Sequence, residues 1–174
     1  MKNLNTYITE KILINKNTNI YNYHPKTIDE LRELVDKLIK ERGNNANLND
    51  IDTSKITNMS QLFSKSDFNG DISKWNISNV KNMRAMFYNS HFNGDISKWD
   101  VSNVENMEWM FYASKFNGDI SKWDVSNVEN MSYIFCYSKF TGDISKWNTN
   151  NVIHMTYMFN KSPLEKNPPK WYKK

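Results

Sequence analysis

One string of residues recurs along this chain at a constant spacing of 24 residues. Phe-Asn-Gly-Asp-Ile-Ser-Lys-Trp begins at Phe68, Phe92 and Phe116, and a fourth copy begins at Phe140 with Thr141 in place of the asparagine. A unit of 24 residues is too short to enclose a core, so it must bury its apolar residues against neighbouring copies. The sequence therefore predicts a stack of repeats with one continuous core and long exposed faces, which favour binding over catalysis.

The period divides the chain into three regions. Residues 1–43 lack it and predict an N-terminal cap, residues 44–163 hold five repeats, and residues 164–174 predict a C-terminal capping fragment. Trp171 lies 24 residues after Trp147, so this fragment resembles the start of a further coil that covers the last repeat.

The N-terminal cap is expected to hold a hairpin and a helix. Residues 7–23 alternate enough to suggest the hairpin. Thr27 and Glu30 have the spacing of a capping box, and Gly43 stands where a helix stop is favoured. Between them runs one apolar stripe of helical spacing, formed by Ile28, Leu31, Leu34, Val35, Leu38 and Ile39.

Each repeat shows two apolar periods in succession. In the second copy a strand-like spacing comes first, at Ile72, Trp75, Ile77 and Val80. A helix-like spacing follows, at Met83, Met86, Phe87 and Ser90. The pattern predicts an α/β repeat protein in which each unit is one strand and one short helix, and the repeated tryptophans form an interior column.

A glycine precedes each predicted strand. The positions are Gly70, Gly94, Gly118 and Gly142. Because glycine adopts positive φ at little cost, we expect the chain to turn there in a left-handed conformation.

The units reading Gly-Asp-Ile-Ser-Lys-Trp-Asp-Val-Ser-Asn-Val-Glu-Asn-Met, followed by Met-Phe, resemble the BspA-type, DUF285 leucine-rich-like repeats of bacterial surface proteins and mycoplasma lipoproteins. The resemblance covers about residues 44–163. It implies a right-handed, leucine-rich-repeat-like solenoid that binds or adheres without catalysis. Surface members of the family are expected to carry an export signal or a lipid-anchored cysteine. The segment from Met1 to Ile8 has neither, which favours the cytoplasm; a surface location requires an N-terminal extension.

Composition excludes little beyond disorder and membrane insertion. The 23 basic residues are nearly matched by 19 acidic ones, and no stretch reaches membrane-spanning length.

Cys136 is the sole cysteine, so no internal disulfide can form. His24, His91 and His154 belong to separate regions and suggest neither a catalytic triad nor a metal site. We therefore expect no enzymatic activity, no cofactor and no metal.

A lysine column recurs on the predicted sheet face, at Lys74, Lys98, Lys122 and Lys146. Such a column can neutralise a phosphate backbone, so nucleic-acid binding is one hypothesis. An aspartate column runs beside it, at Asp71, Asp95, Asp119 and Asp143. Charge balance on an ordinary surface is the stronger interpretation, with the aspartates forming turns rather than binding calcium.

Aromatic residues outside the core stripe are the better candidates for partner binding. They are Trp109, Tyr133 and Tyr157 in one column and Tyr88, Tyr112 and Tyr137 in adjacent columns. The first column carries Gln61 and Ala85 in the early repeats, so packing does not demand an aromatic ring there. The alternative is that these rings only cover neighbouring coils.

The sequence thus favours a non-enzymatic module that binds a protein partner. A bacterial or mobile-element factor that docks onto a host complex and inhibits it is the sharper form of this hypothesis. A surface adhesin is the first alternative, from the family resemblance, and nucleic-acid binding is the second. The oligomeric state stays open.

Overall fold

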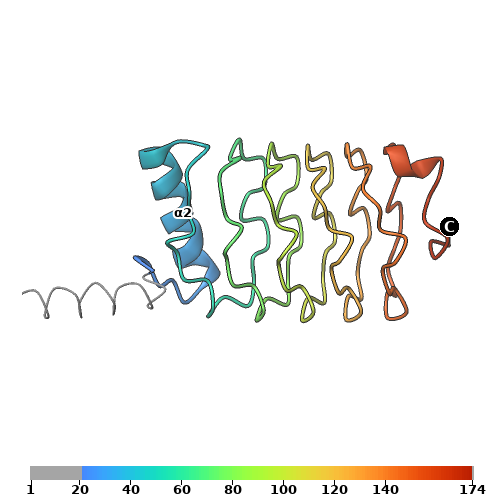
Figure 1. Cartoon of the computed structure of the whole chain (residues 1–174), viewed down its shortest axis with the longest axis horizontal. Helices are drawn as coiled ribbons and strands as arrows, with labels where there is room; N and C mark the ends of the chain where they lie inside the picture. Colours follow the sequence, from blue (N-terminus) through green and yellow to red (C-terminus); the bar gives the residue numbers. More distant parts are fainter. Residues whose placement is uncertain (1–20, 174) are drawn as a thin grey trace, which may run out of the picture.

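In the computed structural model, which describes residues 21–173, the repeats lie side by side along one axis (Figure 1). Helix α2 (Ile28–Arg42) lies at the N-terminal end of the row, and the short 3-10 helix η1 (Pro163–Glu165) lies at the other end. The hairpin expected over residues 7–23 falls almost wholly outside the described residues.

Helix α2 forms where the cap sequence predicts a helix. The Thr27 hydroxyl accepts a hydrogen bond from the Glu30 N–H at 3.2 Å, which satisfies one free donor of the first turn. Gly43 ends the helix with φ of 86°, a conformation that favours glycine. One stripe of the helix is buried against the first coil, through Leu31, Val35 and Leu38.

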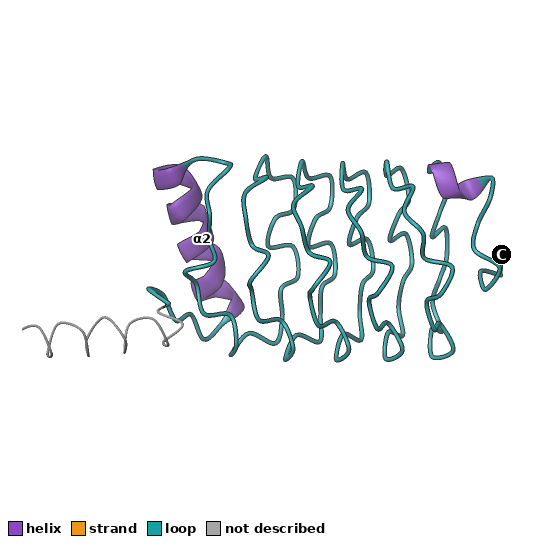
Figure 2. Cartoon of the chain, viewed as in Figure 1, coloured by secondary structure: helices purple, strands orange, loops and turns teal. Residues whose placement is uncertain are grey.

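The repeats themselves differ from the predicted strand-and-helix unit. Over residues 44–162 the backbone forms turns and isolated parallel bridges, with neither a helix nor a strand (Figure 2). The bridges join equivalent residues of successive coils: Asn58 to Asn82, Asn82 to Asn106, Asn106 to Asn130, and Asn130 to His154. Bridges between successive coils therefore hold these repeats together, and the repeats contain no helix within residues 44–162.

The segment expected to be helical is a run of tight turns that alternates two kinds of hydrogen bond. The N–H groups of Met83, Ala85, Phe87 and Asn89 donate to carbonyls of the following coil at 2.7–2.9 Å. Between them, Met86 and Tyr88 donate to the third residue before, Met83 and Ala85, each at 3.1 Å. Ala85 and Asn89 have φ of 54° and 47°. Two left-handed residues four positions apart break a helix while keeping its apolar spacing.

Two columns of stacked phenylalanines fill the interior. Neighbouring rings of the first column lie 5.7–6.1 Å apart between centroids and within 5° of parallel, through Phe63, Phe87, Phe111, Phe135 and Phe159. The second column has spacings of 6.3–6.4 Å and consists of Phe68, Phe92, Phe116 and Phe140. Within a coil the two columns touch, as Phe111 and Phe116 do at 4.4 Å. Together they form the continuous core that the period predicts.

The tryptophans line this core at its edge. Trp99 is 4% exposed, lies 6.3 Å from the Phe87 ring, and donates through Nε1 to the Ile72 carbonyl at 3.2 Å. Trp171 continues the pattern: it donates to the Ile144 carbonyl at 2.9 Å and stacks on Trp147 at 6.4 Å. The C-terminal fragment therefore covers the last repeat on its tryptophan side, as the spacing of Trp171 predicts.

The repeated glycines have a different role from the one expected. Among the glycines only Gly43 has positive φ. At Gly118, a Cβ atom would lie 2.9 Å from ring atoms of Phe116, two residues earlier, and Gly94 meets Phe92 in the same way. Glycine is required there because the phenylalanine ring occupies the space of a side chain.

Candidate binding surface

Six aromatic side chains outside the core meet in one continuous patch, which we call the aromatic belt. Its members are Tyr88, Trp109, Tyr112, Tyr133, Tyr137 and Tyr157. Centroid distances of 5.4 Å, 5.9 Å and 6.5 Å link Tyr157 to Tyr133, Tyr133 to Trp109, and Trp109 to Tyr88. Distances of 5.0 Å and 5.6 Å link Tyr88 to Tyr112 and Tyr112 to Tyr137. Every aromatic residue that the sequence singled out is thus brought to one surface.

The belt is accessible to solvent along its length. Tyr157 is 57% exposed and Tyr137 is 46% exposed, and the other four rings are half-buried. Burial raises the pKa of Tyr112, so its hydroxyl stays protonated at neutral pH and can donate a hydrogen bond. The rings therefore offer both apolar area and polar tips to a partner.

Four members of the belt sit in the left-handed backbone region. Trp109, Tyr133, Tyr137 and Tyr157 have φ of 57°, 60°, 58° and 50°. A bulky side chain is unusual there and costs roughly 1–3 kcal/mol, whereas glycine or asparagine meets the same requirement with less strain. Gln61 and Ala85 share this conformation in the first two coils, so the coil imposes positive φ but does not impose an aromatic side chain.

A cation lies beside the belt near each end. The Arg84 guanidinium lies 4.7 Å from the Trp109 ring centroid, and its Nε donates to Glu108 at 2.9 Å. At the other end, the Lys161 ammonium lies 4.8 Å from the Tyr137 ring and donates to the Tyr137 hydroxyl at 2.7 Å. That hydrogen bond raises the pKa of Lys161, which keeps the group charged.

A depression of about 530 Å³ opens where the belt approaches helix α2. Trp109 and Tyr88 form its aromatic side, and three basic residues border it, namely Arg32, Lys65 and Arg84. Arg32 and Arg84 are paired with Asp29 and Glu108, each at 2.9 Å. The depression is thus mildly basic and suits a partner with an acidic or polar side chain next to an apolar one.

The predicted lysine column does not join the belt. All four lysines are exposed, but Lys98 lies 13 residues after Ala85 and 11 residues before Trp109, half-way around the coil from the aromatic column. Beside it, the Ser97 N–H donates to the Asp95 carboxylate at 2.9 Å. This bond and the nearby Lys98 charge lower the pKa of Asp95, and Asp119 and Asp143 are held in the same way. The prediction that these aspartates form turns is confirmed.

The lone thiol also lies apart from any reactive arrangement. Cys136 is 2% exposed, and burial raises the pKa of its thiol. It occupies the position of Tyr112 in the preceding repeat, while Tyr137 takes the outward place one residue later. The thiol is neutral at physiological pH and contributes to packing.

In the comparison with known proteins, one family model matches the chain. DUF285, described as a Mycoplasma protein of unknown function, matches residues 3–114, 29–137 and 88–172. The chain belongs to the DUF285 family. The overlapping matches are typical of a repeat protein, which can align in more than one register, and they confirm the resemblance seen in the sequence. No curated protein and no solved structure matches the chain.

This DUF285 protein has site residues that sequence reasoning missed. Arg84, Glu108 and Lys161 flank the belt through contacts between coils. Arg84 and Glu108 are 24 residues apart and of opposite charge, as are Lys81 and Glu105, which lie 2.9 Å apart. Opposite charges at the repeat spacing are a signal that could have found them. Among the described residues of this DUF285 chain, no helix has the length and apolar character needed to cross a bilayer.

Proposed function

We propose that this DUF285 protein is a non-enzymatic module that binds a partner protein on the aromatic belt. In this proposal the stacked coils are a leucine-rich-repeat-like solenoid whose core holds the belt in a fixed arrangement. The sharper form of the proposal is that the module docks onto a host complex and inhibits it by covering a surface of that complex.

One observation carries the proposal: the aromatic column begins only at the third coil. The left-handed position holds Gln61 and Ala85 first, and then Trp109, Tyr133 and Tyr157. The position has a φ of 50–60° in all five coils, so the backbone conformation does not explain the change. Large rings held in a strained conformation on an exposed face are what a binding function requires.

The chemistry of the belt suits a protein partner. Tyrosine, tryptophan and arginine are the residues that most often dominate protein interfaces, and the two aromatic residues bury large areas while losing little rotamer freedom. Arg84 and Lys161 flank the belt and add charged contacts for acidic groups of the partner. The lysine column, which nucleic-acid binding would use, faces away from the belt and is balanced by aspartates.

Affinity capture with matched variants tests this function. The immobilised chain is expected to retain one stoichiometric protein from a host-cell lysate. Trp109→Ala combined with Tyr133→Ala should abolish capture while circular dichroism and gel-filtration volume stay unchanged. The matched controls are Gln61→Ala, which lies in the same column before the belt, and Lys98→Ala with Lys122→Ala on the opposite side.

Both controls should retain the partner. Unchanged capture by the double aromatic variant would remove the belt as the site. Loss of binding in the lysine variant, together with an affinity that falls steeply with salt, would instead indicate nucleic acid.

A further inference from the structure

Within residues 21–173, the last coil carries a row of backbone donors that faces no further coil. In the preceding coil, N–H groups donate to carbonyls of the last coil at 2.8–3.0 Å, from Met131, Tyr133, Phe135 and Tyr137. The equivalent residues of the last coil are Met155, Tyr157, Phe159 and Lys161. Within residues 21–173, only the N–H of Lys161 among these four has an acceptor. Three donors at two-residue spacing are therefore left at the open edge.

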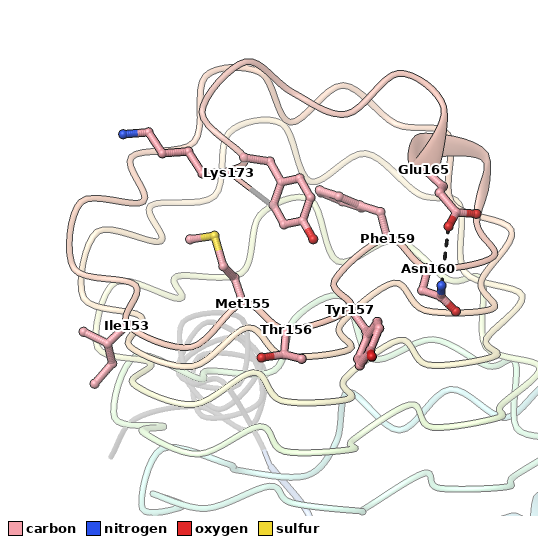
Figure 3. Close-up of a pocket in the computed structure, with 9 residues that line it drawn as sticks. Ile153, Met155, Thr156, Tyr157, Phe159, Asn160, Glu165 and Lys173 are labelled. Carbon is pink, nitrogen blue, oxygen red and sulfur yellow. Dashed lines mark hydrogen bonds between the residues drawn. The ribbon is translucent and has the colours of Figure 1, made fainter.

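These donors border a hollow of about 540 Å³ (Figure 3). Met155, Thr156 and Tyr157 follow one rim of the hollow, and Lys173 and Glu165 lie across from them. Tyr172 packs edge-on against Phe159 at 4.9 Å, so the C-terminal fragment closes one side and leaves the remainder open. The hollow lies where the segment of a next coil would run.

A column of charged residues becomes apolar at this edge. The position holds Thr57 in the first coil, the charged residues Lys81, Glu105 and Glu129 in the next three, and Ile153 in the last. Ile153 is 70% exposed and lines the hollow. Ile153 therefore adds exposed apolar area to the hollow, and a partner that covers it would gain the free energy of burying that area.

One donor of this row already binds an acceptor from elsewhere in the chain. One carboxylate oxygen of Glu165 takes the Lys161 N–H at 3.0 Å, and the other lies 3.4 Å from the Asn160 side-chain nitrogen. An acceptor from outside the coils thus fills the fourth place in the row. The three remaining places call for acceptors at the same two-residue spacing, which the carbonyls of a polypeptide segment provide when it takes the turn conformation of a coil.

A second copy of the chain does not meet this requirement. Two C-terminal edges brought together would place donors against donors. The opposite end of the stack, which carries the matching carbonyls, is covered by helix α2, where Arg32 donates to the Ser60 carbonyl at 3.3 Å. The complementary partner is therefore a segment of another protein that takes the turn conformation of a coil.

We propose that the open edge of the last coil is a binding site for a polypeptide segment of another protein, which takes the turn conformation of a further coil, adds to Met155, Tyr157 and Phe159, and covers Ile153. This site is separate from the aromatic belt in its chemistry: it uses backbone donors, and only Tyr157 belongs to both. It goes beyond the proposed function because it predicts a second contact of a different kind.

The test uses the full chain labelled with ¹⁵N and a peptide probe that copies residues 103–114, acetylated and amidated. In the stack, carbonyls of this segment accept the N–H groups of the preceding coil, so the peptide carries the required pattern. Without peptide, the amides of Met155, Tyr157 and Phe159 should exchange with solvent at least about tenfold faster than those of Met131, Tyr133 and Phe135. With peptide, the three edge amides should shift and their exchange should slow.

Two variants and a scrambled peptide sharpen this result. Ile153→Lys restores the residue type of Lys81 without altering the backbone, and it should weaken peptide binding about tenfold. Tyr88→Ala with Trp109→Ala, which removes belt rings that do not contact Tyr157, should leave peptide binding unchanged, so failure of the belt and failure of the edge are distinguishable. The scrambled peptide should also bind weakly, because the side chains over Ile153 and Tyr157 are then misplaced.

Three results would overturn the proposal. The first is equal exchange of the edge amides and their matched controls in the free protein. The second is peptide-induced shifts confined to the belt, and the third is no shift at the solubility limit of the peptide.

Discussion

The inner phenylalanine columns and the outer aromatic belt share a 24-residue period but obey different rules. Inside, phenylalanine recurs in all five coils of the first column and in four coils of the second, and adjacent rings of the first column lie within 5° of parallel. Outside, residue types change along the column and ring planes are inclined by 7–69°. The interior is uniform because each ring must fit between two copies of itself. The exterior is free to vary, so its aromatic content reflects something other than packing.

The largest effect is expected from the interior. Trp123→Ala removes a buried ring that lies 6.3 Å from Phe111 and donates to the Ile96 carbonyl at 3.1 Å. The free energy of unfolding should fall by about 3–5 kcal/mol, measured by urea denaturation. Trp123→Phe, which retains most of the ring, should lose less. Equal losses for the two variants would contradict a role for ring packing.

A smaller loss is expected from adding one methyl group to the interior. Gly118→Ala places a Cβ 2.9 Å from the Phe116 ring and should cost roughly 1–3 kcal/mol by overpacking. Gly43→Ala is the control for backbone strain. Its φ of 86° opposes a side chain, but nothing lies within 4 Å of the added atom, so overpacking does not contribute there. If adding Phe116→Leu reduces the loss of unfolding free energy in the Gly118 variant, the ring is the cause. An unchanged loss would argue against it.

At a left-handed position of the outer backbone, a substitution by glycine should raise the unfolding free energy rather than lower it. Ala113 has φ of 51°, so Ala113→Gly relieves a left-handed conformation worth roughly 1–2 kcal/mol, offset by about 0.5–1 kcal/mol of added chain entropy. We expect a gain in unfolding free energy of up to about 1 kcal/mol. Ala46→Gly, at a buried position outside the left-handed set, should instead destabilise the fold. A loss at both positions would show that the strain is absent.

The smallest effect concerns pH and the aspartate turns. The pKa of Asp95 is lowered because the Ser97 N–H donates to the carboxylate, so this group contributes stability that is present above the unfolded pKa of about 4. The contribution is lost as pH falls through the lower folded value. Melting temperature measured from pH 7 to pH 3 should decline less for Asp95→Asn, which keeps the acceptor, than for the parent chain. An identical decline would exclude this turn as a source of acid sensitivity.

The sequence was most informative where structure depends on local chemistry. Thr27, Glu30 and Gly43 signal the start and end of α2 through contacts within a few residues. The repeat spacing likewise located Trp171 over Trp147. Both inferences need only neighbouring residues or a fixed period.

Conformation inside the repeats was not readable in this way. The left-handed residues are alanine, glutamine, lysine, asparagine and aromatic residues, which carry no glycine signal, and their four-residue spacing imitates a helix. The glycines that do recur are needed for space against a ring, which is a property of packing. Hydrogen bonds between coils decide the outcome, and they depend on residues 23 positions away, as from Met83 to Asn106.

The candidate site was predicted in part. Enrichment of one column identified the aromatic residues, because they broke a repeating pattern. The cations beside them and the open edge at Ile153 were missed, although Ile153 breaks its charged column just as clearly. Both proposals therefore rest on interruptions of the period rather than on the period itself.

One comparison tests the central claim directly: the unfolding free energies of Phe135→Ala and Tyr133→Ala, two residues apart in the same coil. We predict a loss of about 3–5 kcal/mol for the buried Phe135 and about 1 kcal/mol or less for the half-buried Tyr133. Losses of similar size would mean that the outer rings hold the fold together, and the aromatic belt would then need no partner to explain it.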